Sequence, residues 1–181
     1  MKKYFILLLL FWSSLHSLEF SELKTKLIEA GKPYDLSLTL LAIAKVESNY
    51  GQVKVNLQDP SCGVTMVHLK FFLKRYNIED TPLKRNFACQ RLMNNDDLAI
   101  AEAVAILTYW KTKLCGKWGC TSSEWENVWG AYNAGKRYDG KAGVAYSKKI
   151  RKVIKELKKD KEIYLSILEN KERRDHASEG V

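Results

Sequence analysis

The chain has 181 residues, of which 46% are hydrophobic, and its 30 basic and 21 acidic residues give a formal net charge of +9. This length fits one domain with a sizeable core, and no linker divides the sequence. The four cysteines and three histidines include no CxxC pair and no histidine cluster, so the sequence indicates no metal site and no cofactor.

The first seventeen residues have the layout of a secretory signal peptide. Met1–Lys3 is positively charged, residues 4–12 are apolar, and residues 13–17 are small or polar. We therefore expect cleavage after Ser17 and a periplasmic or secreted protein. The apolar run is shorter than the roughly 20 residues of a membrane-spanning helix, so no stable span is expected after cleavage. An uncleaved membrane anchor is the alternative.

The exported part begins with two predicted helices. Residues 20–31 are amphipathic, because their leucines and isoleucine recur at helical spacing. A second helix is predicted from Leu36 to Tyr50, with Asp35 as its N-terminal cap and Gly51 as its stop.

The middle of the chain is predicted to alternate between loops and helices. Residues 52–63 are rich in Asn, Gln, Asp, Pro and Gly, which indicates a loop or a short extended segment. Residues 66–76 have apolar side chains at helical spacing. Residues 77–95 contain a Thr-Pro step and are predicted to be a loop. A long helix then runs to Cys115, capped by one of the two aspartates at 96 and 97.

Two further helices are predicted in the last third. Ser123 and Glu126 match a capping box, and the helix that they begin ends at Gly135. The last helix covers residues 142–157, with Tyr146 among its core residues. We expect residues 1–17 to be the signal peptide, 18–169 one mainly α-helical domain with its core at 36–157, and 170–181 a disordered polar tail. No other domain is predicted.

All four cysteines lie in the exported part, and an even number in an oxidising compartment predicts two disulfides. Cys115 and Cys120 flank four residues and could close one short loop, which would leave Cys62 with Cys89. Three pairings are possible, and the sequence leaves the choice open. Four free thiols are the alternative if the protein is not exported.

Glu47 is the strongest candidate for a chemical role. Leu36, Leu40, Ile43 and Glu47 are spaced by four, three and four residues, so Glu47 continues an apolar stripe of its helix. Burial raises the pKa of a carboxyl group, and a protonated carboxyl near neutral pH can donate its proton to a leaving oxygen. Periodicity alone also fits an ordinary helix-terminal glutamate paired with Lys45 or with a later basic residue.

Three segments resemble the motifs of the soluble lytic transglycosylase family in the lysozyme-like superfamily. Ala42–Gly51 resembles its Glu-Ser signature, Asp59–Val67 its Gly-Leu-Met-Gln-like segment, and Ala131–Gly135 its Ala-Tyr-Asn-Ala-Gly motif. The resemblance covers residues 36–157. It implies a mainly α, lysozyme-like domain with a short loop or extended segment at the cleft and with disulfides.

The resemblance also implies a reaction on peptidoglycan glycan strands. Glu47 would protonate the glycosidic oxygen between N-acetylmuramic acid and N-acetylglucosamine, and then accept the proton of the muramic C6 hydroxyl as a 1,6-anhydro end forms. Ser48, Met66, Tyr132 and Asn133 would contact the substrate. Met66 stands where the family commonly has Gln, which removes an amide that could bind sugar.

The sequence keeps other functions open. A true muramidase would use Asp59 to activate water, with Asp139 as a further candidate. A non-catalytic wall-binding or assembly protein could keep the same fold. The basic segment from Lys148 to Lys161 could dock on an anionic surface or on a secretion or conjugation apparatus, or simply be solvated. Nucleic acid is not an expected partner outside the cytoplasm.

Overall fold

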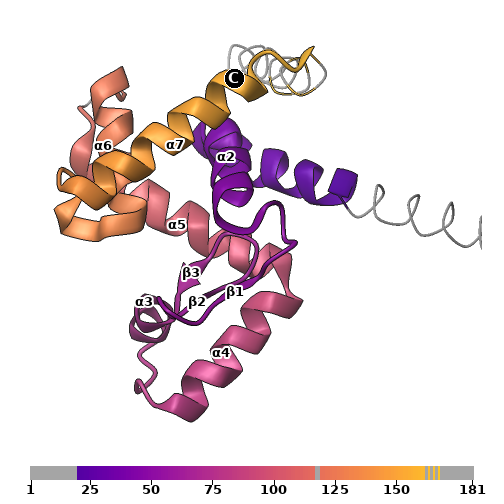
Figure 1. The fold of residues 1–181 in the computed structure, drawn as a ribbon, viewed down its shortest axis with the longest axis vertical. Helices are drawn as coiled ribbons and strands as arrows, with labels where there is room; N and C mark the ends of the chain where they lie inside the picture. Colours follow the sequence, from indigo (N-terminus) through magenta and orange to yellow (C-terminus); the bar gives the residue numbers. More distant parts are fainter. Residues whose placement is uncertain (1–19, 117–118, 162, 164, 166, 168–181) are drawn as a thin grey trace, which may run out of the picture.

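Helices dominate the chain, and a small three-stranded sheet lies beside them (Figure 1). The computed structural model describes residues 20–116, 119–161, 163, 165 and 167, so the expected signal peptide and most of the polar tail lie outside the described residues. Residues 20–31 form the first described helix. The elements after it are η1 (Lys32–Tyr34), α2 (Ser37–Ser48), β1 (Val55–Asn56), β2 (Ser61–Cys62), β3 (Val67–His68), α3 (Leu69–Arg75), α4 (Pro82–Asn94), α5 (Asp96–Leu114), α6 (Ser122–Ala134), η2 (Gly135–Arg137) and α7 (Lys141–Leu157).

The central helix α2 is shorter at both ends than predicted. Asp35 does not cap it, because its backbone is left-handed with φ of 59°. The Ser37 hydroxyl instead donates a hydrogen bond of 2.8 Å to the carbonyl oxygen of Ile28, which links α2 to the first helix. At the other end, Asn49 is left-handed, so α2 ends at Ser48 and not at Tyr50.

The sheet is antiparallel, in the order β1-β2-β3, and it occupies part of the predicted loop and the start of a predicted helix. Met66 was expected to be helical, but its φ is 49°, so it lies in the turn before β3. His68 caps α3, which therefore begins only at Leu69. A disulfide between Cys62 and Cys89 ties β2 to α4.

The prediction of a loop over residues 77–95 is wrong. Thr81 and Pro82 start helix α4: the Thr81 hydroxyl accepts a hydrogen bond from the Lys84 backbone N–H at 3.3 Å, and Pro82 occupies the first turn, where its missing N–H costs nothing. Helix α5 is capped by Asn95 and not by an aspartate, since the Asn95 side chain accepts from the Leu98 backbone N–H at 2.9 Å.

Helices α6 and α7 pack closely against each other. The capping box of α6 consists of Thr121 and Glu124, two residues before the predicted pair, and α6 ends at Gly135 as expected. A Cβ on Gly143 would lie 2.1 Å from the Tyr138 carbonyl oxygen, and one on Gly130 would lie 2.8 Å from it. Glycine at 143 therefore lets α7 fold back against the turn that precedes it, and glycine at 130 lets α6 approach that turn and the backbone of Gly143.

The core lies where α2 meets α5 and α7 (Figure 1). Leu36, Leu40 and Ile43 are fully buried, as their spacing predicted. A second disulfide joins Cys115 to Cys120 after α5, so the two pairs are those that a short Cys115–Cys120 loop implied. Two such bonds fit an oxidising compartment. None of the helices in the described part of the chain has the length and apolar character that a membrane crossing requires.

Candidate active site

Hydrogen bonds join the three motif segments directly. The Ser48 hydroxyl, at the end of α2, lies 2.6 Å from the Val64 carbonyl oxygen and can donate to it. The Tyr132 hydroxyl, on α6, donates to the Thr65 carbonyl oxygen at 2.8 Å. The Thr65 hydroxyl in turn donates to the Ala99 carbonyl oxygen of α5 at 2.8 Å. The second motif is therefore held by α2, α5 and α6 together.

The turn that these bonds hold has unusual backbone angles. Gly63 has φ of +87°, and a Cβ there would lie 2.9 Å from the Leu92 carbonyl oxygen and from the Ala99 Cβ, so only glycine fits. Met66 also has positive φ and is only partly buried. Its sulfur lies 3.8 Å from the Ser61 hydroxyl. This strained turn is maintained by its hydrogen bonds to the helices.

Glu47 lies in the last turn of α2, on the continuation of the buried apolar stripe, and is half-buried. Burial raises the pKa of its carboxyl group above 4.5, and the negative charge of Asp59 raises it further. The Tyr146 hydroxyl and the positive charge of Lys149, both on α7, act in the opposite direction and lower this pKa. Desolvation is the largest of the four effects, so the protonated carboxyl persists to higher pH than in an exposed glutamate.

Lys45 is not the partner of Glu47. Its ammonium group is exposed and donates to the Asn49 side chain at 2.7 Å. The pair with Lys45 that periodicity also allowed is therefore absent, whereas a later basic residue, Lys149, does act on Glu47. Glu47 is left with neighbours from α7, which lies about one hundred residues further along the chain.

Of the two α7 neighbours, Tyr146 has the larger effect on the pKa of Glu47. Its side chain is 6% exposed and lies parallel to the Tyr132 ring, with the centroids 6.5 Å apart and an interplanar angle of 18°. Its hydroxyl is close enough to Glu47 to alter the pKa of that carboxyl, yet among the described residues it completes no hydrogen bond of normal geometry. Burial and the Glu47 charge raise the pKa of the Tyr146 hydroxyl, so it stays a donor.

Asp59 lies in the turn between β1 and β2, and its side chain is 65% exposed. One of its carboxylate oxygens lies 3.2 Å from Nε2 of His68. Nδ1 of His68 accepts a hydrogen bond from the Lys70 backbone N–H, so the hydrogen of the neutral ring is on Nε2, where it can be donated to Asp59. Asp59 therefore keeps one oxygen exposed for other contacts.

The other predicted site residues have different surroundings. Ser48 is 1% exposed and bonded to backbone groups. It therefore positions the turn, in contrast to the expected contact with a substrate. Tyr132 also bonds to the backbone of this turn, while Asn133 is exposed on α6. Sequence reasoning missed Lys149, and for Tyr146 it favoured packing in the core or at the rim over a position in the cleft. Their spacing of three residues on one helix was the available signal.

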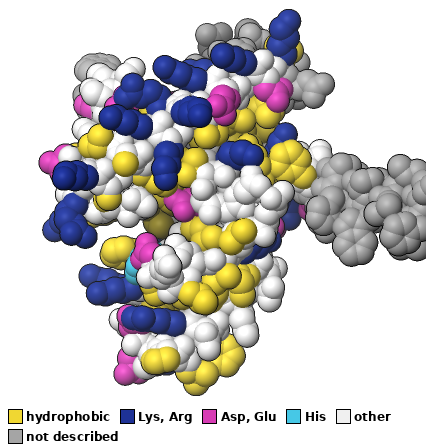
Figure 2. Space-filling model, in the orientation of Figure 1, with side chains coloured by type: hydrophobic (Ala, Val, Ile, Leu, Met, Phe, Trp, Pro, Cys, Tyr) yellow, Lys and Arg dark blue, Asp and Glu magenta, His cyan; other side chains and the backbone are white. Residues whose placement is uncertain are grey.

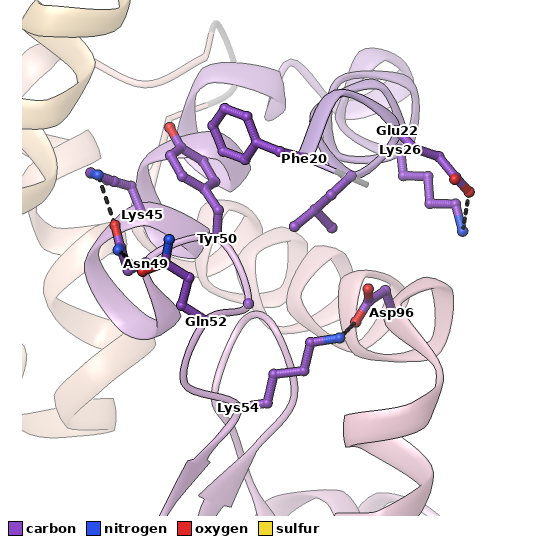
Figure 3. A pocket seen from close by; sticks show the side chains of 11 residues that line it. Phe20, Glu22, Lys26, Lys45, Asn49, Tyr50, Gln52, Lys54 and Asp96 are labelled. Atoms are coloured by element: carbon purple, nitrogen blue, oxygen red, sulfur yellow. Dashed lines mark hydrogen bonds and ion pairs between the residues drawn. The ribbon is translucent and has the colours of Figure 1, made fainter. Parts of the chain in front are cut away.

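A separate cavity of about 630 Å³ lies beside the end of α2, and Glu47 does not line it (Figure 3). Tyr50 and Phe20 meet there edge to face, with ring centroids 5.0 Å apart. Lys54 is paired with Asp96 at 2.7 Å, as the dashed line in Figure 3 shows. Burial raises the pKa of Tyr50 to about 12, so its hydroxyl is neutral. This cavity offers no group with the setting of Glu47.

Neither metal binding nor similarity to known proteins gives the site a further assignment. Within the described ranges, no group of three or more His, Cys, Asp or Glu side chains could hold a metal ion. Comparisons with protein-family models, with curated proteins and with solved structures gave no match.

Proposed function

We propose that the protein is an exported lytic transglycosylase that cleaves the β-1,4 bond between N-acetylmuramic acid and N-acetylglucosamine in peptidoglycan. The observation that carries the proposal is the half-buried carboxyl of Glu47, with its raised pKa, beside the buried hydroxyl of Tyr146. Further support comes from Ser48 and Tyr132, which connect the three segments that resemble the family's motifs. The two disulfides fit the oxidising compartment that an exported protein enters.

Glu47 would act first as an acid and then as a base. Its protonated carboxyl donates a proton to the glycosidic oxygen, and the bond from that oxygen to C1 of the muramic sugar breaks. The resulting carboxylate accepts the proton of the C6 hydroxyl while that oxygen bonds to C1. Glu47 ends protonated, no water is consumed, and one carboxyl group suffices where most glycosidases use two.

Tyr146 and Lys149 would support the ionised half of this cycle. Both favour the carboxylate of Glu47, while burial favours the acid. A hydroxyl that stays protonated can donate to the carboxylate once the first proton has left. The opposed effects would allow one group to give up a proton and then take one back near neutral pH.

A muramidase is the second candidate, and the position of Asp59 favours it. Its charge acts on the pKa of Glu47, so the two groups are near each other, and the exposed carboxylate can be reached by water. In an inverting hydrolase the second carboxylate activates a water molecule between the two groups. The product distinguishes the candidates, because hydrolysis leaves a reducing end and transglycosylation an anhydro end.

The test is mass spectrometry of the fragments that the protein releases from purified peptidoglycan. We expect 1,6-anhydro ends from the wild type, and a decrease in rate of about 10²- to 10⁴-fold for Glu47→Gln. Glu156→Gln is the matched control, because it changes an exposed glutamate of α7, and its rate should equal that of the wild type. Reducing ends carrying oxygen from ¹⁸O-labelled water would support the muramidase. Binding without release by the wild type would support a non-catalytic wall-binding protein.

A further inference from the structure

Four lysines form a row along the outward face of α7, which we call the lysine row: Lys141, Lys148, Lys152 and Lys155. Their spacings of seven, four and three residues keep them on one face of the helix. All four are exposed, whereas the opposite face of α7 is buried in the core. At 1.5 Å per residue the row extends over about 21 Å.

The lysine row forms no ion pairs within the described part of the chain. None of its members forms an ion pair with a carboxylate of the described residues, although Arg151, on another side of α7, binds Glu126. In the α3–α4 region, by contrast, Lys84 pairs with Glu79 and Arg85 with Asp80. Figure 2 shows dark-blue side chains gathered over the upper part of the molecule, where α7 lies, with fewer magenta side chains among them.

Two acidic residues, one in the last turn of α7 and one just after it, point toward the end of α2. Glu156 and Asp160 act on the pKa of Tyr50, so they lie on the side of α7 that faces the end of α2. Lys149, which adjoins the lysine row, acts on Glu47 from that same side. The row therefore passes the candidate active site near its middle, where Lys148 adjoins Lys149, with Lys141 on one side and Lys152 and Lys155 on the other.

We propose that the lysine row is a second binding surface for the substrate polymer, and that it holds the carboxylates of the peptide side chains on the glycan strand. This inference rests on the proposed function, because it assigns to the row the polymer on which Glu47 acts. An anionic chain that passes Glu47 would run beside a row that spans about 21 Å and whose ammonium groups form no ion pair with a described carboxylate. The row thus fits a repeating polyanion better than a single small anion.

A membrane surface fits the row less well. Helices that bind in the membrane interface insert an apolar face among the lipids. The apolar face of α7 is already occupied, because Tyr146, Ile150 and Ile154 are buried against the rest of the protein. Apart from the exposed Val144, the outward face of α7 offers mainly ammonium groups, which match fixed anionic groups on an extended chain.

The test measures binding without turnover, by co-sedimentation with insoluble peptidoglycan in a Glu47→Gln background. We expect the triple change Lys148→Gln, Lys152→Gln and Lys155→Gln to weaken binding about 10-fold and to make it less dependent on salt. The control replaces three exposed lysines elsewhere, Lys70, Lys74 and Lys113, by Gln, and its binding should stay within about 2-fold. Equal binding by the two triple variants would overturn the inference.

Two further arms make the result specific. Arginine at the same three positions should restore binding, which separates lost charge from a folding defect, and a failure to restore it would count against the inference. Peptidoglycan whose carboxylates have been amidated should bind the Glu47→Gln protein about 10-fold less tightly than untreated polymer. Undiminished binding to the amidated polymer would exclude carboxylates as the ligand.

Other ligands and the proposed function are tested separately. If the row is needed for binding to phosphatidylglycerol vesicles or to duplex DNA but not to peptidoglycan, the surface serves another partner and the inference is wrong. If the wild type binds peptidoglycan through the row but releases no fragments, the proposed reaction fails while the inference stands. Cleavage of a short peptide-free glycan should be unaffected by the triple change, because that substrate carries no peptide carboxylates.

Discussion

Glu47 and Asp59 are close enough for their charges to interact, yet the protein surrounds them differently. Glu47 is held by a helix, is half-buried, and has a tyrosine and a lysine of α7 as neighbours. Asp59 lies in a turn, is largely exposed, and contacts His68. The difference shows that packing, and not the type of residue, determines which carboxyl can serve as a proton donor. Three substitutions test this contrast.

The largest of the three effects is expected for Tyr146→Phe. Loss of the hydroxyl removes the group that would donate to the Glu47 carboxylate once its proton has left, so the rate should fall about 10- to 100-fold, the range for a hydrogen bond to a charged group. The pKa of Glu47 should rise further, because the hydroxyl lowers it. The alkaline limb of the pH–rate profile, where the acid form of Glu47 is lost, should therefore move to higher pH.

Stability separates this role of Tyr146 from a structural one. The Tyr146 hydroxyl completes no hydrogen bond with a described residue, so its removal should leave the melting temperature nearly unchanged. Tyr132→Phe is the matched control, because it breaks the bond to the Thr65 carbonyl and should cost about 1 kcal/mol. Equal pH profiles for wild type and Tyr146→Phe would contradict the assignment.

A smaller effect on rate is expected for Asp59→Asn. If Glu47 acts alone, kcat should change by no more than about 3-fold, well below the contribution of a general base. Loss of the Asp59 charge lowers the pKa of Glu47, so the alkaline limb should move to lower pH, opposite to the shift for Tyr146→Phe. Asp59 is instead the base of a hydrolase if the rate drops 10²-fold or more.

The smallest effect concerns stability. Burial raises the pKa of Glu47 in the folded protein above its ordinary value of 4.5, so the folded state loses stability as the pH rises from 4.5 through the raised pKa. Glu47→Gln removes this cost and should raise the melting temperature at pH 7, by about 2–4 °C for each 1 kcal/mol recovered. The gain should vanish below pH 4. A constant difference at all pH values would show that the carboxyl is not desolvated.

Local patterns predicted the helices well where apolar spacing was regular. The stripe of Leu36, Leu40 and Ile43 is fully buried, and α7 begins one residue before its predicted start. The patterns failed where one residue type is compatible with two local structures. Thr81 followed by proline predicts a loop, but Thr81 caps α4. The apolar spacing predicts that Met66 is helical, but its positive φ excludes it from the helix.

The candidate site was predictable only in part. Glu47 could be singled out because its place on an apolar stripe is a local property of the sequence. Its relation to Tyr146 and Lys149 depends on how α2 packs against α7, which spacing within one helix does not encode. The role of Ser48 was missed for the same reason, since its partner Val64 belongs to a turn sixteen residues away.

The bonds from Ser48 and Tyr132 to this turn end on carbonyl oxygens of the main chain. Because every residue has such an oxygen, these two bonds do not depend on which side chains the turn carries. The side chain of Met66 takes no part in these two bonds. Substitutions at position 66 that tolerate its positive φ, such as Asn or Gly, could change which sugars the site accepts without disturbing its proton chemistry.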